Sequence, residues 1–189
     1  MLLNDREIAE LCNKHSMISP FRKEKIHKIK NRRVVSFGLS SFGYDISLSR
    51  ADFRIFVFNN ETALVVDPKN PKNTFYSLRP ASDGSFLIPP HSYALGVSKE
   101  HFKMPFDVLG ICIGKSTYAR CGIILPMTPL EPDWRGHLTV EISNSNSLPA
   151  KVYADEGIAQ VIFLQGNLPD LSYSGKYQDQ GPLVKTADV

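Results

Sequence analysis

Short runs of alternating apolar and polar residues fill most of the chain between residues 36 and 164. The stretch 44–48 is typical, because Tyr44, Ile46 and Leu48 are apolar and polar residues stand between them. Side chains that alternate in this way point to opposite faces of a β-strand. Further strands are predicted at residues 53–58, 63–66, 86–88, 109–113, 138–142, 151–153 and 158–164. Many short strands separated by Asp-Gly and Pro-Pro turns predict a mainly β fold, either a barrel or a sandwich.

One short helix is predicted near the N-terminus, from Asn4 to about Lys14. Asn4 can cap the helix, and Glu7 stands three residues later, which is the spacing of a capping box. The helical unit is expected to end at Ser19-Pro20, since proline disfavours helix before and at its own position.

The length of 189 residues fits a single domain that spans the whole chain. Residues 1–20 are expected to form the helix and its cap, and residues 165–189 an extended tail rich in Gly, Pro and polar residues. Hydrophobic residues make up 42% and charged residues 22%, which is an ordinary globular balance. No apolar run reaches the length of a membrane span and no apolar signal core begins the chain. We therefore expect a cytoplasmic protein with no membrane partner.

The net charge of +3 provides no strong field for capturing a long nucleic acid, whereas a small anionic substrate needs only a local positive cluster. A basic run does extend from Arg22 to Arg33, with only Glu24 opposing it. This run could contact nucleic acid, but no aromatic residues interleave with it for base stacking. A solvated face or loop explains the run better, and we expect no nucleic-acid partner.

Cysteine and histidine spacing excludes one class of metal site. The three cysteines, Cys12, Cys112 and Cys121, contain no C-x-x-C pair, so reduced thiols are expected rather than disulfides or structural zinc. Zinc-dependent nucleobase deaminases carry H-x-E followed by P-C-x-x-C, and no histidine here is followed by x-Glu. A zinc deaminase is therefore excluded. A Ser-His-Asp hydrolase is not excluded by spacing, but no G-x-S-x-G elbow supports one.

The sequence of residues 110–117, GICIGKST, is similar to the phosphate-binding loop motif but does not match it. Three residues separate the two glycines where the motif needs four, and the segment after Thr117 is poor material for the required helix. Lys115, Ser116, Thr117 and Arg120 still place two cations and two hydroxyls within six positions, a combination that suits phosphate oxygens. A polar turn with solvated Lys and Arg side chains explains them equally well.

Two polar side chains stand out within predicted strands. Glu141 lies on the face of the strand 138–142 that points away from Leu138, Val140 and Ile142. On an outer face Glu141 would simply be solvated, whereas in a cleft its pKa would rise and it could move protons near neutral pH. Gln160 lies in the apolar strand 158–164 and needs hydrogen-bond partners, which either the protein or a ligand can provide, with protein partners slightly favoured.

The segment 114–122, GKSTYARCG, resembles a motif of the dCTP deaminases in the trimeric dUTPase superfamily. The similarity continues, in the same order along the chain, through GYDI (43–46), IPPHSYAL (88–95), EPDWRG (131–136), TVEISN (139–144) and GIAQ (157–160). The resemblance implies a distorted β-barrel or jelly-roll of the dUTPase-like type and a homotrimer with sites between subunits. It also implies dCTP as substrate, Mg²⁺ bound through the triphosphate, and no zinc.

The resemblance also assigns roles to individual residues. Glu141 matches the general base that activates water for attack on C4 of cytosine, and Ser116 and Arg120 match residues that orient this water and stabilise charge. Substrate contacts are implied for Lys115, Ser116, Thr117, Tyr118, Ala119, Arg120, Glu131, Thr139, Val140, Glu141 and Gln160, and for the tail residues Tyr173, Lys176 and Gln180. The tail is thereby expected to close over the active site.

Some features depart from the family pattern or leave an alternative open. The segment between Tyr173 and Lys176 is shorter than in relatives, and Glu131 stands where some members carry Asp near the sugar. Some members also hydrolyse the dUTP they form, so the alternative is a bifunctional enzyme that releases dUMP and pyrophosphate. The resemblance further implies dTTP as a feedback inhibitor.

Overall fold

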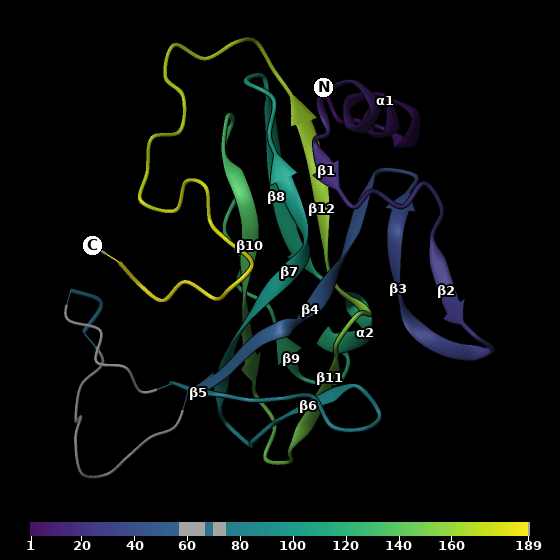
Figure 1. The fold of residues 1–189 in the computed structure, drawn as a ribbon, viewed down its shortest axis with the longest axis vertical. Coiled ribbons are helices and arrows are strands. Elements are labelled where there is room, and N and C mark those ends of the chain that lie inside the picture. The colour runs from purple at the N-terminus through teal and green to yellow at the C-terminus, as the bar shows by residue number, and fades with distance from the viewer. Residues whose placement is uncertain (57–66, 70–74, 189) are drawn as a thin grey trace.

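Antiparallel β-sheet dominates the fold, as the alternating sequence pattern predicts (Figure 1). The structure is a computed structural model that describes residues 1–56, 67–69 and 75–188. Within these ranges ten strands join one sheet, and β6 and β11 form a separate pair. The elements in chain order are α1 (Asp5–His15), β1 (Ile18–Ser19), β2 (Ile26–Ile29), β3 (Arg32–Ser40), β4 (Gly43–Phe56), β5 (Phe75–Ser77), β6 (Ser85–Ile88), β7 (Tyr93–Lys103), β8 (Val108–Gly114), α2 (Ser116–Ala119), β9 (Ile123–Ile124), β10 (Arg135–Asn144), β11 (Ala150–Tyr153) and β12 (Gly157–Gln165).

Strand β4 connects the two parts of the sheet and crosses the molecule diagonally in Figure 1. Its first part pairs with β3 and β12, so that Asp45 lies opposite both Gly38 and Gln160. After a shift in register, its later part pairs with β7, where Phe53 lies opposite Gly96. Strand β12 continues to β8, and β7 continues to β10 and β9. One long strand therefore holds together the two regions in which the predicted site residues lie.

Apolar side chains from both parts of the sheet form the core. Tyr44, Phe53, Phe86, Phe102 and Phe163 are among its largest fully buried side chains. The rings of Phe53 and Phe86 stack with centroids 4.1 Å apart. Aromatic side chains of this kind bury roughly 150–250 Å² each and so supply much of the hydrophobic stabilisation.

The N-terminal helix confirms the prediction made from its capping residues. Helix α1 spans Asp5–His15 with Asn4 as its N-cap, whose side chain accepts hydrogen bonds from the backbone of Arg6 and Glu7. The Glu7 carboxylate accepts a hydrogen bond from Asn4 N at 2.8 Å, which completes the capping box. Such a cap contributes about 1 kcal/mol because it satisfies backbone groups that the helix itself leaves free.

The basic run lies on a hairpin made by β2 and β3, and a loop is the wrong description for residues 26–29 and 32–33. Most of its side chains are exposed, in agreement with a solvated face. Short-range alternation could not reveal these strands because Lys and Arg occupy both faces of the hairpin.

Strand β7 is the longest strand that the pattern does not predict. It spans Tyr93–Lys103 and carries Ser98 and Glu100, which are only 1% and 2% exposed. Their burial is possible because Ser98 Oγ donates to Glu100 O at 2.6 Å and Glu100 accepts hydrogen bonds from Ser47 N and Oγ. The partner of the Glu100 carboxylate, Ser47, lies far along the chain on β4, so the local sequence gives no sign that this carboxylate can be buried.

The other predicted strands are confirmed with small changes in length, except where the chain is not described. Strand β4 confirms the predicted strand 53–58 as far as Phe56, and residues 57–58 and 63–66 lie outside the described residues. The segment after Thr117, predicted to be unsuited to a helix, adds only two residues to the single turn α2 before the chain turns at Gly122 and continues into β9. No helix in the described part of the chain is long and apolar enough to cross a membrane.

Candidate active site

A pocket of about 380 Å³ lies where β7 and β10 meet the C-terminal tail. This volume is in the range of small-molecule sites. Its walls come from β7, from the segment that leads into β10, from β10 itself and from the tail. The lining residues are Leu95, Thr128, Pro129, Leu130, Glu131, Trp134, Leu138, Thr139, Glu141, Tyr173, Tyr177, Gln180 and Lys185.

Glu141 points into this pocket from β10 and is half-buried. Its neighbours Val140 and Ile142 are fully buried in the core, so the predicted alternation along this strand is confirmed. Glu141 Oε2 is buried and accepts no hydrogen bond from any residue that the structure describes. Burial raises the pKa of Glu141 above its ordinary value of 4.5, and its own backbone amide offsets this only in part. A carboxylate with a raised pKa is a stronger proton acceptor than a solvated one.

Two weakly acidic side chains lie within electrostatic reach of Glu141. Burial raises the pKa of Cys112 to about 12, and the negative charge of Glu141 adds to that effect. The same two causes raise the pKa of Tyr93 to about 12. Both groups therefore stay neutral at physiological pH and add no second negative charge beside the glutamate.

The tail is held against β10 by a series of hydrogen bonds. Trp134 Nε1 donates to Tyr177 O at 2.8 Å, and His137 N donates to Gln180 O at 2.9 Å. Gln180 Nε2 donates to Thr139 Oγ1 at 2.6 Å inside the pocket. Figure 1 shows the tail leaving β12, running away from the sheet and returning beside β10. Two predicted tail residues, Tyr173 and Gln180, thus lie in the same pocket as Glu141.

The end of the tail is anchored beyond the pocket. Val184 is 5% exposed and packs with Leu95 and Val97 of β7. Its backbone N donates to Asp52 Oδ2 at 3.0 Å, and Asp52 also pairs with Arg54 at 2.8 Å. The tail, which lines the pocket with Tyr173, Tyr177, Gln180 and Lys185, is therefore held at two places, one at Tyr177 to Gln180 and one at Val184.

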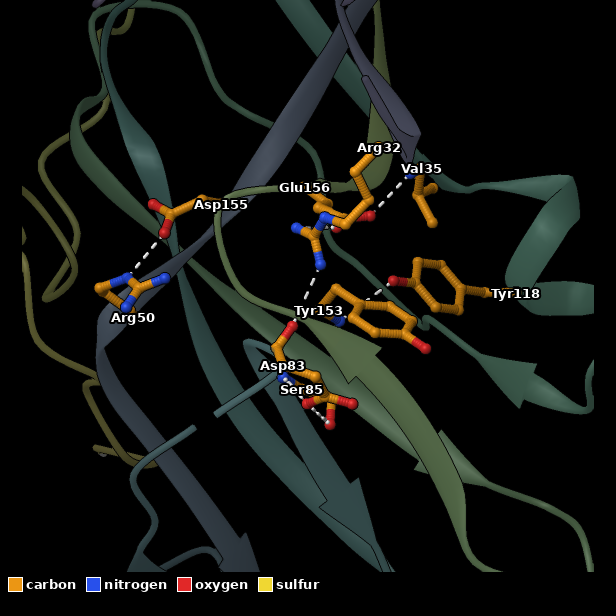
Figure 2. A network of polar contacts seen from close by, with 9 residues as sticks. All are labelled: Arg32, Val35, Arg50, Asp83, Ser85, Tyr118, Tyr153, Asp155 and Glu156. Carbon is orange, nitrogen blue, oxygen red and sulfur yellow. Dashed lines mark hydrogen bonds and ion pairs between the residues drawn. The ribbon is translucent and has the colours of Figure 1, made fainter. Parts of the chain in front are cut away.

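The other predicted site residues lie apart from Glu141 within this one chain. None of residues 115–120 is among the described residues that line the Glu141 pocket. Ser116, Thr117, Ala119 and Arg120 are exposed at the surface. Tyr118 is buried, and its hydroxyl accepts a hydrogen bond from Tyr153 N at 3.3 Å, as Figure 2 shows.

Lys115 and Gln160 lie near the beginning of β4. Lys115 Nζ is 2.7 Å from Asp45 Oδ2, and its side chain is only 9% exposed. Gln160 Nε2 donates to Ser40 Oγ at 3.0 Å, so the protein supplies a partner for the amide. The ion pair at Lys115 was not expected, because Asp45 appears in the alternating pattern as an outward-facing residue.

Three predicted contacts are limited by where their side chains point. The side chain of Val140 is fully buried in the core, so only its backbone can contact a ligand in the pocket. Tyr118 is likewise buried, which leaves its backbone as the accessible part. Lys176 does not line the pocket, and its ammonium lies 5.6 Å from the ring centroid of Tyr177, which does.

Several pocket residues are missed by the sequence analysis. Tyr177 and Lys185 belong to the tail, and Leu95 and Leu138 belong to strands that also serve the core. Their roles depend on the return of the tail to β10, for which the sequence contains no local signal. Among the described residues, no group of three or more His, Cys, Asp or Glu side chains is arranged to hold a metal ion.

Comparison with solved structures identifies the fold. The chain is similar to the crystal structure of 2'-deoxycytidine 5'-triphosphate deaminase from Agrobacterium tumefaciens, with a TM-score of 0.60 and 15% sequence identity. The match covers 87% of this chain, which spans 48% of the length of that one. The predicted fold class, a mainly β fold of this type with one short N-terminal helix, is confirmed.

Sequence comparison identifies the family. A family model described as dCTP deaminase-like matches residues 2–166. A dCTP deaminase from Campylobacter fetus is 52% identical over 185 residues, which cover 95% of this chain and 94% of the relative. A dCTP deaminase from Rickettsia bellii is 48% identical over 183 residues, which cover 95% of both chains. The chain therefore belongs to the dCTP deaminase-like family.

Proposed function

We propose that this protein deaminates dCTP to dUTP and ammonia and that Glu141 is the general base. One observation carries the proposal: the Glu141 carboxylate lines a pocket of small-molecule size with one buried oxygen unpartnered among the described residues and a raised pKa. A carboxylate whose charged form is poorly stabilised is a better proton acceptor than a solvated one.

The reaction needs one water molecule, whose two protons end on N3 and on the leaving group. Glu141 takes a proton from the water and passes it to N3 as the hydroxide attacks C4 of cytosine. Glu141 then takes the proton of the C4 hydroxyl and delivers it to N4, so that the C4–N4 bond of the tetrahedral intermediate breaks and N4 leaves as ammonia. General acid–base catalysis of this kind typically contributes about 10²- to 10⁴-fold.

The proposed site is completed by a second copy of the chain. Ser116 and Arg120 are exposed and do not line the pocket of their own chain, so a neighbouring subunit can bring them to Glu141. There Ser116 would orient the water and the Arg120 guanidinium would stabilise negative charge that develops in the transition state. A homotrimer with three equivalent interfaces provides this arrangement three times.

Substrate contacts follow from the same assembly. Lys115, Ser116 and Thr117 would bind the triphosphate, and Mg²⁺ would enter with the triphosphate rather than through protein ligands. Thr139, Glu141 and the backbone of Val140 would contact base and sugar together with Glu131. Tyr173, Lys176 and Gln180 would close the tail over the phosphates, and Gln160 would support the site from β12. Because the proposed base is a carboxylate, the proposed chemistry needs no zinc.

A single assay of the purified protein tests this function. The protein is incubated with dCTP and Mg²⁺, and dCTP, dUTP, dUMP and ammonia are quantified with time. We expect dUTP and ammonia to form in equal amounts, and treatment with a zinc chelator should leave the rate unchanged. Absence of dCTP turnover would refute the proposal. Formation of dUMP and pyrophosphate would instead reveal the bifunctional alternative.

A further inference from the structure

Two lysines from different parts of the chain meet at one buried carboxylate oxygen. Lys115 Nζ lies 2.7 Å from Asp45 Oδ2, and Lys25 Nζ lies 2.9 Å from the same atom. The Asp45 side chain is 2% exposed, whereas the side chains of Lys115 and Lys25 are 9% and 35% exposed. Lys115 also donates to Ser36 Oγ at 3.3 Å. The Lys25 ammonium belongs to the basic run, which the proposed function so far leaves without a role.

The charges in this cluster do not balance. Asp45 carries one negative charge and the two ammonium groups carry two positive charges, and neither lysine has another ion-pair partner among the described residues. Asp45 neutralises only one of the two ammonium charges, so their mutual repulsion is only partly offset. Each ammonium has three N–H donors, and both lie at ion-pair distance from Asp45 Oδ2 without making a hydrogen bond to it, so donors remain available to further oxygen atoms. An anion with several oxygens, such as a phosphate, matches both the excess charge and the free donors.

Backbone contacts hold Lys25 next to Asp45. Gly38 lies directly opposite Asp45 in the β3–β4 pairing. The segment before Lys25 packs on this glycine so closely that an added Cβ at Gly38 would lie 2.2 Å from Glu24 O. Leu39 N donates to Arg22 O at 3.0 Å, which fixes the start of the same segment. The backbone position of Lys25 therefore follows from the fold.

The hairpin that follows Lys25 is also tied to the body of the protein. Glu156, which is 4% exposed, accepts from Val35 N at 2.7 Å and pairs with Arg32 at 2.9 Å. Arg32 donates in addition to Asp83 O at 3.2 Å. Figure 2 shows Arg32 and Val35 converging on Glu156 from the hairpin. A site on this hairpin is therefore already ordered before a ligand binds, which lowers the entropic cost of binding.

We propose that Lys25 is a further phosphate-binding residue, which shares the substrate's triphosphate with Lys115 while Asp45 holds both ammonium groups in place. The inference rests on the proposed function, because it names the triphosphate as the anion and the adjacent Ser116 and Thr117 as its other contacts. One residue of the basic run, Lys25, thereby has a specific role, in place of a general attraction of the whole run for anions.

The test measures binding of inorganic tripolyphosphate by calorimetry and, separately, the kinetics of dCTP turnover. Lys25→Met removes the ammonium and leaves the Asp45–Lys115 pair intact, so the protein should stay folded. Lys23→Met is the matched control, since Lys23 is exposed two residues earlier and has no ion pair in the described part of the chain. We expect Lys25→Met to weaken tripolyphosphate binding and to raise KM for dCTP by about tenfold each, the usual scale of one charge-assisted contact, with kcat within about twofold.

Two further variants keep the outcome interpretable. Lys25→Gln removes the charge but can still donate to Asp45, and it should weaken binding as much as Lys25→Met does. Lys25→Arg keeps the charge and should retain most of the binding. The inference is wrong if both neutral variants bind tripolyphosphate as the parent does, or if Lys23→Met weakens binding equally. If the parent binds tripolyphosphate through Lys25 but does not turn over dCTP, the proposed function fails and the anion site stands.

Discussion

Two carboxylates in the middle of strands, Glu141 on β10 and Asp45 on β4, each have a buried oxygen without a hydrogen bond among the described residues, but only Asp45 has cations at ion-pair distance. Glu141 Oε2 is buried with no hydrogen-bond partner among the described residues, and the pKa of Glu141 is raised. Asp45 is 1% exposed and has two lysines within ion-pair distance of one oxygen. Burial of a carboxylate disfavours its charge, and a protein can either supply counter-charges or accept a group that protonates easily.

The different surroundings of Glu141 and Asp45 suit the two regions to different roles in the proposed reaction. A glutamate without a counter-charge can accept and release protons, which is what attack of water on cytosine requires. An aspartate paired with two ammonium groups fixes their positions, which is what binding of a triphosphate requires. The sequence contains both residues in similar alternating patterns, so their roles follow from their partners and not from the strand pattern.

The largest expected effect is the loss of turnover in Glu141→Gln. The substitution keeps the shape of the side chain but removes the proton acceptor, so kcat for dCTP deamination should fall by at least about 100-fold. The unfolding midpoint in urea should stay the same or rise slightly, because an unpartnered buried carboxylate is removed. Glu10→Gln, at an exposed position on α1, is the control and should keep parent activity. Parent-like ammonia release from Glu141→Gln would eliminate Glu141 as the base.

The second effect concerns stability and is expected for Asp45→Asn. Without its charge, two ammonium groups stay close together with no counter-ion, and the free energy of unfolding should drop by roughly 3 kcal/mol. Asp155→Asn is the matched control, because Asp155 also pairs with two cations, Arg50 and Lys99, but is 29% exposed. Its loss should cost at most about 1 kcal/mol. Equal losses in urea denaturation for both variants would show that burial of Asp45 is not what matters.

The third effect is the pH dependence of turnover. Because burial raises the pKa of Glu141 above 4.5, the base becomes protonated at a higher pH than an exposed glutamate would. We expect kcat/KM to fall about tenfold per pH unit on the acid side of a midpoint that lies above the ordinary glutamate range. The same raised pKa means that this group's contribution to stability is present at low pH and is lost as pH rises through the raised value. An acid limb centred at or below 4.5 would contradict the assignment.

The smallest effect is expected from loosening the tail. Gln180→Ala removes the hydrogen bond to Thr139 Oγ1, but the anchors at Trp134 and Val184 remain. KM for dCTP should rise about threefold to tenfold with little change in stability, since one hydrogen bond contributes about 1 kcal/mol. Leu171→Ala is a suitable control in an exposed part of the tail. If KM does not change in Gln180→Ala, the contact at Thr139 plays no part in covering the substrate.

Local signals explain which parts of the fold could be predicted. The capping box at Asn4 and Glu7 and the alternation around Glu141 depend on neighbours in sequence, and both predictions are confirmed. Strand β7 and the hairpin β2–β3 depend on partners far along the chain, such as Ser47 for Glu100 and Glu156 for Val35. Their sequences look polar because the groups that satisfy them lie elsewhere, so the pattern alone could not identify these strands.

The grouping of residues in the candidate site also depends on contacts between distant parts of the chain, which the sequence pattern does not reveal. Alternation could indicate that Glu141 leaves the core, but it could not show that Gln180 returns from 41 residues away to meet Thr139 beside it. The ion pair of Lys115 with Asp45 joins positions on different strands and was equally hidden. The grouping of residues into a site came from family resemblance, and only the three-dimensional contacts separate the Glu141 pocket from the Lys115 cluster.

The most direct test of the central claim is complementation between two inactive variants. Glu141→Gln and Arg120→Ala are co-expressed with different affinity tags, and trimers that carry both tags are purified and assayed with dCTP. If each site takes Glu141 from one subunit and Arg120 from its neighbour, every trimer that carries both tags has one intact site out of three, and about a third of parent activity should return. If mixed trimers are no more active than the two variants alone, the two halves of the site do not meet between subunits and the account is wrong.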